Sequence, residues 1–126
     1  MADVAGTVTI TEITFGTIKK IKAEWVSGQG AHEGTASGTT PSTFDGRILG
    51  AITVPSGTAA PDDNYDIDVK DDDDIDVALN SLHDRDTANT EFVKEADMAA
   101  VAHSTLTIEI THAGSAKEGT LILFIR

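Results

Sequence analysis

Residues 104–111 read STLTIEIT, and this stretch decides the fold class. Leu106, Ile108 and Ile110 alternate with threonine and glutamate, so apolar and polar side chains fall on opposite sides of an extended chain. A period of two is typical of a strand that buries one face. The sequence therefore predicts a half-buried β-strand here.

The first part of the chain repeats this alternation with one irregularity. Val8 and Ile10 alternate with threonines, but Ile13 and Phe15 occupy the opposite parity. A β-bulge inserts one residue and shifts the parity of every side chain that follows. We therefore expect a bulge or a strand break near Glu12.

Other strands follow from composition and parity. Residues 17–26 and 64–70 alternate cleanly, whereas residues 44–55 and 119–126 are apolar on both parities. A strand that is apolar on both sides is either central or meets a partner with its second face. The glycine-rich residues 27–40 read as a long loop or a poorly packed edge hairpin.

Helical character is weak. Residues 88–102 contain no Gly or Pro and predict a short helix, with a strand around Phe92 and Val93 followed by a loop as the alternative. Residues 78–84 fit a single helical turn. We therefore expect an all-β chain, with at most one or two short helices.

The chain of 126 residues suits a single β domain over residues 1–126, with residues 1–6 as a possible extended arm. Six or seven strands with short connections predict an antiparallel β-sandwich or barrel, and they leave a jelly-roll or immunoglobulin-like topology open. The net charge of −12 argues against nucleic-acid partners. Without a long apolar run or a signal-peptide pattern, we expect no membrane partner and synthesis in the cytoplasm.

The aspartate-rich stretch at residues 64–79, NYDIDVKDDDDIDVAL, raises the question of a metal site. The favoured interpretation is a strand followed by an acidic turn, because aspartate carboxylates bond nearby backbone N–H groups. The alternative is an irregular calcium site. It would use Asp71, Asp72, Asp73 and Asp74, whose spacing does not match an EF-hand loop.

Catalytic patterns are weak. The four histidines, His32, His83, His103 and His112, show no metal-ligand spacing, and the chain has no cysteine. Neither a nucleophile elbow nor a phosphate-binding glycine loop occurs. We therefore expect no enzyme activity, no cofactor and no metal.

The second half of the chain resembles a group of small structural proteins of tailed bacteriophages, the capsid decoration (cement) proteins. The resemblance covers roughly residues 42–126. It departs at Asp74, where that group has glycine, and at Asp84, where it has asparagine. The matching residues are Pro61, Asn64, Tyr65 and Asp66, the acidic residues 71–74, Arg85, and Ala113, Gly114, Ala116, Lys117, Gly119 and Arg126.

The resemblance implies a virion protein on the outer capsid surface that bridges subunits of the major capsid protein and assembles with copies of itself, as a trimer or another symmetric assembly. Alternatives are a tail or neck component, or a calcium-dependent carbohydrate-binding module.

Such a role requires a surface that binds neighbours. The interface candidates are Val4 and Val8 in the N-terminal segment and Ile122 and Phe124 in the last strand. Alternation allows Ile122 and Phe124 to face a partner, but it equally allows the reverse assignment.

Overall fold

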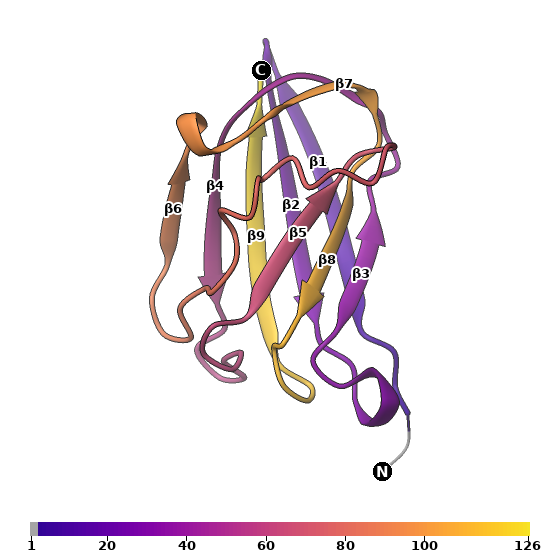
Figure 1. Ribbon diagram of the computed structural model, residues 1–126, viewed down its shortest axis with the longest axis vertical. Coiled ribbons are helices and arrows are strands. Elements are labelled where there is room, and N and C mark those ends of the chain that lie inside the picture. The colour runs from indigo at the N-terminus through magenta and orange to yellow at the C-terminus, as the bar shows by residue number, and fades with distance from the viewer. Residues whose placement is uncertain (1–2) are drawn as a thin grey trace.

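The computed structural model describes residues 3–126 and confirms an all-β fold of two antiparallel sheets (Figure 1). Two single-turn 3-10 helices, η1 (Gly30–His32) and η2 (Glu95–Asp97), are the helical elements of these residues. The strands within this range are β1 (Thr7–Phe15), β2 (Ile18–Val26), β3 (Ala36–Thr39), β4 (Phe44–Pro55), β5 (Asp66–Lys70), β6 (Glu91–Lys94), β7 (Ala100–Ser104), β8 (Thr107–Thr111) and β9 (Glu118–Ile125).

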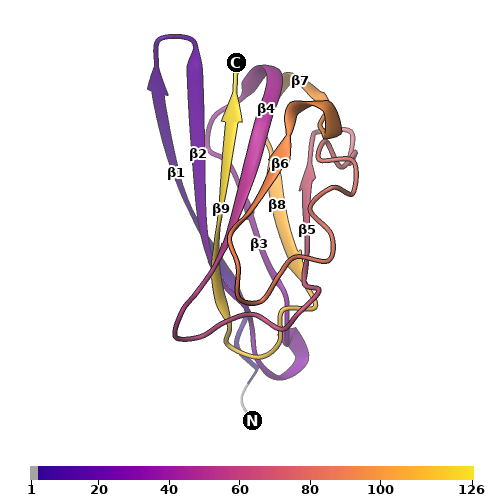
Figure 2. The same ribbon diagram turned by 90° about the vertical axis from the view of Figure 1, so that its left-hand side faces the viewer.

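The two sheets differ in size and lie face to face, as Figure 2 shows. The large sheet has the order β1-β2-β9-β4-β6, with β7 pairing with β4 as well, and the small sheet has the order β3-β8-β5. Chain-distant strands are therefore neighbours, since β2 pairs with β9 and β9 with β4. This architecture of two antiparallel sheets confirms the expected all-β fold of the sandwich or barrel type.

The core fills the space between the sheets. Ile108 and Ile110 of β8 are buried, as the alternation in residues 104–111 predicts, and they belong to the same core cluster as Leu121 and Leu123 of β9. Trp25 of β2 meets Tyr65, next to β5, with ring centroids 5.4 Å apart and a tilt of 51°. Aromatic pairs in such tilted arrangements add to area burial, so this contact joins the two sheets.

The predicted bulge near Glu12 is wrong. β1 pairs with β2 in one register from Thr7↔Val26 to Phe15↔Ile18, without a shift. Ile13 and Phe15 change parity because they leave the core: their exposed fractions are 53% and 88%. They lie on the hairpin between β1 and β2, which projects beyond the rest of the sandwich at the end where the C-terminus lies (Figure 2).

The predicted helix at residues 88–102 is also wrong. This segment forms β6, the single turn η2 and β7, and both strands pair with β4. The alternative, a strand around Phe92 and Val93, is nearer to the structure. The residues that this segment buries, Met98 and Val101, do not follow a helical stripe. Residues 27–40 likewise contain more structure than a loop, namely η1 and β3.

Candidate functional site

The outer face of the large sheet, the side turned away from the small sheet, carries an uncovered apolar surface. In β9, Leu121, Leu123 and Ile125 are fully buried, so Ile122 and Phe124 point outward. This assignment removes the ambiguity that alternation alone leaves in the last strand. The apolar side chains on both sides of β9 therefore have two different environments.

Neighbouring strands extend this surface. Ile122 lies beside Ile52 of β4, which in turn lies beside Phe92 of β6. Phe92 has an exposed fraction of 73%, while the side chains of Ile52, Ile122 and Phe124 are half-buried. We call Ile52, Phe92, Ile122 and Phe124 the sheet patch. Contiguous exposed apolar side chains of this kind mark interaction surfaces more often than isolated ones do.

Lysines flank the sheet patch. Lys20 is the cross-strand partner of Phe124, Lys22 is the partner of Ile122, and Lys94 is the partner of Gly50 beside Phe124. These three cations belong to a chain whose net charge is −12. The end of the face near the β1–β2 hairpin is thus locally basic, although most of the surface is acidic.

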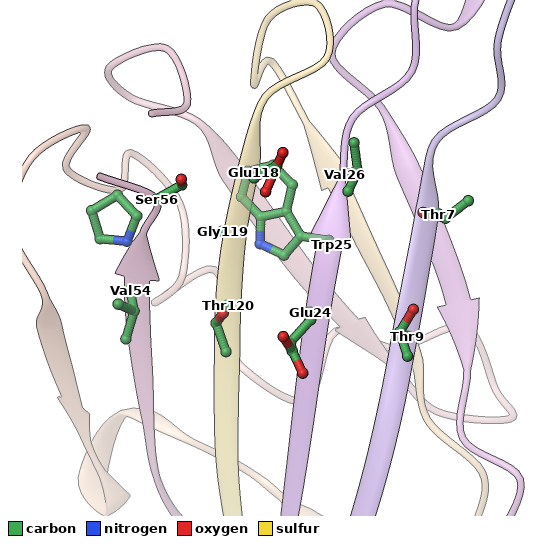
Figure 3. A pocket seen from close by; sticks show the side chains of 11 residues that line it. Thr7, Thr9, Glu24, Trp25, Val26, Val54, Ser56, Glu118, Gly119 and Thr120 are labelled. Carbon is green, nitrogen blue, oxygen red and sulfur yellow. The ribbon is translucent and has the colours of Figure 1, made fainter. Parts of the chain in front are cut away.

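The opposite end of the same face contains a shallow hollow of about 410 Å³ (Figure 3). Glu24, Glu118 and Thr9 line it with other polar side chains, and no histidine is among its lining residues in the described chain. Trp25 forms part of its floor beneath Gly119, where a Cβ atom would lie 2.5 Å from the indole Cζ2. The hollow offers polar contacts but no paired nucleophile and base.

The four interface candidates do not share one surface. Ile122 and Phe124 lie in the sheet patch, but Val8 faces inward and packs against the core. Val4 is exposed and exchanges backbone hydrogen bonds with Gln29, at 3.2 and 2.8 Å. Residues 3–6 therefore lie against the chain's own loop, and residues 1–2 of the expected arm lie outside the described residues.

The aspartate run forms a turn. One carboxylate oxygen of Asp71, Oδ1, accepts hydrogen bonds from the backbone N–H groups of Asp73 and Ile75, both at 3.0 Å. Asp72 accepts the Thr105 hydroxyl at 3.0 Å, and the carboxylate of Asp74 lies 3.6 Å from Lys70 Nζ. The carboxylates of residues 71–74 therefore point to different partners instead of converging on a common ion.

A different trio brings possible metal ligands together. Within residues 3–126, ligand atoms of Asp68, Asp76 and His83 lie within 4.8 Å of one another. Asp76 uses both carboxylate oxygens on backbone N–H groups, those of Val69, Ala78 and Asn80. These contacts give Asp76 a structural role that holds the segment after β5. The spacing of the three residues matches no metal motif, so the sequence gives no signal for the trio.

Two histidine–aspartate pairs lie on the outer side of the small sheet. His83 Nε2 lies 2.6 Å from Asp68, and this hydrogen bond raises the pKa of His83. His112 Nδ1 lies 2.8 Å from Asp66. Burial alone would raise the pKa of Asp66, but hydrogen bonds from the Asp84 backbone N–H and from His112 outweigh it and lower that pKa.

These pairs lack the third member of a hydrolytic triad. Among the hydrogen bonds of residues 3–126, no serine or threonine hydroxyl bonds to a histidine ring. A nucleophile activated by a histidine needs to lie within hydrogen-bond reach of that ring. The pairs therefore stabilise charge on the small sheet and supply no nucleophile.

Comparison of the chain with protein-family models, with curated proteins and with solved structures finds no match. Across the part of the chain that the structure describes, no helix is long and apolar enough to cross a membrane.

Proposed function

We propose that this chain is a non-enzymatic virion protein of a tailed bacteriophage, which decorates the outer capsid surface and stabilises it by bridging subunits of the major capsid protein. Assembly in the host cytoplasm and contacts between copies of the chain belong to the same proposal. The observation that carries it is the sheet patch, because an uncovered apolar surface on a rigid sandwich suits permanent contacts with neighbouring subunits.

The mode of action is burial of the sheet patch, repeated over many copies. Each contact buries the exposed ring of Phe92 and the outward sides of Ile52, Ile122 and Phe124. A protein that engages several subunits of one shell gains affinity beyond that of a single contact. The acidic remainder of the surface stays in water and opposes nonspecific association with nucleic acid.

Backbone geometry supports the resemblance at both of its departures. Asp74 replaces the glycine of the phage pattern and Asp84 replaces the asparagine, and their φ angles are 62° and 56°. Glycine and asparagine are the residues most often found at positive φ, and aspartate also tolerates it. The two substitutions are therefore compatible with the turns that the phage pattern encodes.

The first experiment counts this chain relative to the major capsid protein by quantitative mass spectrometry of purified virions. A ratio near one, or a simple fraction of it, supports decoration of the shell. A few copies per particle would assign the chain to the tail or neck, and absence from virions would refute the structural role.

A binding experiment tests the surface itself. We expect Phe124→Asp to abolish binding to shells that lack the protein, because it places a charge within the apolar sheet patch. Phe92→Asp on the more exposed edge strand should act in the same direction with less risk to folding. Ser37→Asp adds the same charge on the exposed side of β3 and serves as the control. Equal binding by all three variants would exclude the sheet patch as the docking surface.

A further inference from the structure

Two further surfaces of the molecule are apolar, exposed and opposite in charge. The first is the tip of the β1–β2 hairpin, where Ile13 and Phe15 have exposed fractions of 53% and 88%. Their cross-strand partners are Lys20 and Ile18. We call Ile13, Phe15, Ile18 and Lys20 the hairpin tip. Lys20 forms no ion pair within residues 3–126, so its charge is available to a partner.

The second surface follows β5. Ile75 and Leu79, with exposed fractions of 55% and 54%, both follow the run of aspartates at residues 71–74, Ile75 directly and Leu79 four residues later. We call residues 71–79 the acidic loop. The Asp73 side chain forms no hydrogen bond or ion pair within residues 3–126, and its backbone N–H is held by Asp71. The loop thus presents two apolar side chains and a free carboxylate on a turn fixed by its own hydrogen bonds.

We propose that copies of this chain associate head to tail, with the hairpin tip of one copy bound to the acidic loop of the next. Apolar side chains face apolar side chains in this contact, and Lys20 faces the aspartates. This inference rests on the self-association included in the proposed function, but it requires no shell.

Charge disfavours the two symmetric contacts, hairpin tip against hairpin tip and acidic loop against acidic loop. Pairing two hairpin tips would place Lys20 of one copy against Lys20 of the other, with Lys22 nearby. Pairing two acidic loops would bring together the aspartates of both copies. Like charges across an interface oppose association, whereas opposite charges steer it and fix the register. The contact between unlike surfaces is therefore the one that the charges favour.

The places of the hairpin tip and the acidic loop on the molecule affect how many copies can join. The hairpin tip and the turn after β5 both lie toward the end of the molecule that carries the C-terminus, on opposite layers of the sandwich (Figure 2). A contact between unlike surfaces produces a ring when the rotation closes and a filament when it does not. Both forms contain more than two copies, so the head-to-tail contact predicts an assembly larger than a dimer in either case.

Sedimentation analysis of the purified wild-type chain at low salt is the first test, and we expect a species larger than a dimer. Raising the ionic strength to about 0.5 M should weaken association by up to about fivefold, because salt screens the exposed charges of Lys20 and the aspartates. Phe15→Glu and Ile75→Lys should each abolish association, since each places a charge that repels the opposing surface. Ser37→Glu is the control: it adds a charge on the exposed side of β3, outside both surfaces, and it should leave association unchanged.

Mixing the two defective variants tests the head-to-tail geometry. The Phe15→Glu variant keeps its acidic loop and the Ile75→Lys variant keeps its hairpin tip, so an equimolar mixture should form a 1:1 dimer and nothing larger. A wild-type chain that stays monomeric at high concentration would refute the inference while leaving shell binding intact. Association without complementation in the mixture would refute it in favour of a symmetric contact. Association with loss of shell binding would refute the proposed function alone.

Discussion

Two adjacent residues of β9 provide a matched test of the sheet patch. Ile122 and Leu123 have side chains of the same size, and both pair with β2 on one side and β4 on the other. They differ in the face they occupy, because Leu123 is fully buried and Ile122 points outward. Replacing each in turn by alanine therefore compares the two faces at almost the same place in the backbone.

The structure sets the expected magnitudes. Leu123→Ala removes core contacts and leaves a cavity, which should lower the free energy of unfolding by about 3 kcal/mol. Ile122→Ala replaces isoleucine by a residue with a lower preference for strands and removes part of the contact with Ile52. It should lower the free energy of unfolding by about 1 kcal/mol. At about 4 °C per kcal/mol for a chain of this size, the melting temperature should fall by about 12 °C for the first variant and about 4 °C for the second.

Urea and thermal unfolding, followed by circular dichroism on monomeric protein, measure these differences. In shell binding the order of the two variants should reverse. Ile122→Ala should lower the affinity for the shell, whereas the folded Leu123→Ala variant should bind with the wild-type affinity. Equal losses of stability for the two monomeric variants would show that both faces are covered by the chain itself, and the reasoning that makes the outer face an interaction surface would fail.

Three further predictions concern titration and metal binding. Burial raises the pKa of Tyr65 to about 12 from 10.0, so stability present below pH 10 should be lost as the pH rises toward 12. Tyr65→Phe should remove this alkaline loss, which amounts to about 2–3 kcal/mol when unfolding in urea is measured across that range. The raised pKa of His83, caused first by its hydrogen bond to Asp68, should stabilise the fold below pH 6.5 and fade as the pH rises through the raised value. His83→Gln should then flatten the dependence of melting temperature on pH above the ordinary histidine pKa of 6.5, and an unchanged profile would contradict this role. Asp72→Asn combined with Asp73→Asn should shift the melting temperature by no more than about 2 °C, with or without calcium, and a calcium-dependent stabilisation that the double variant loses would reveal a metal site.

Local periodicity predicts much of this fold. The alternation around Ile108 identifies β8, and the apolar residues on both parities of β9 fit its position in the middle of the large sheet. The acidic turn follows from aspartate chemistry alone, since Asp71 bonds to the backbone two and four residues further on. In these segments the local pattern and the tertiary contacts require the same conformation.

Other features depend on contacts that the sequence pattern does not contain. The apolar residues Ile13 and Phe15 change parity because the β1–β2 hairpin extends past the facing sheet. The point at which the facing sheet stops covering the hairpin is visible only in the arrangement of the two sheets. Residues 88–102 have a helical composition, but pairing with β4 makes parts of them strands. Tertiary contacts override intrinsic preference in such segments.

The candidate surface was predicted in part. Ile122 and Phe124 could be named from the sequence, but their outward direction could not, because alternation fits both assignments. Their neighbours Ile52, Phe92 and Lys20 come from strands distant in the chain and are brought together by the sheet order. A surface assembled from residues so far apart leaves no continuous motif.

The contact between Trp25 and Tyr65 gives the protein an internal optical reporter. The chain has one tryptophan and one tyrosine, and they come from opposite sheets with ring centroids 5.4 Å apart. At this separation the excited tyrosine transfers its energy to the indole, so tyrosine emission is quenched as long as the sheets stay packed. Recovery of tyrosine fluorescence would therefore report separation of the two layers without any attached dye, in solution or within an assembled particle.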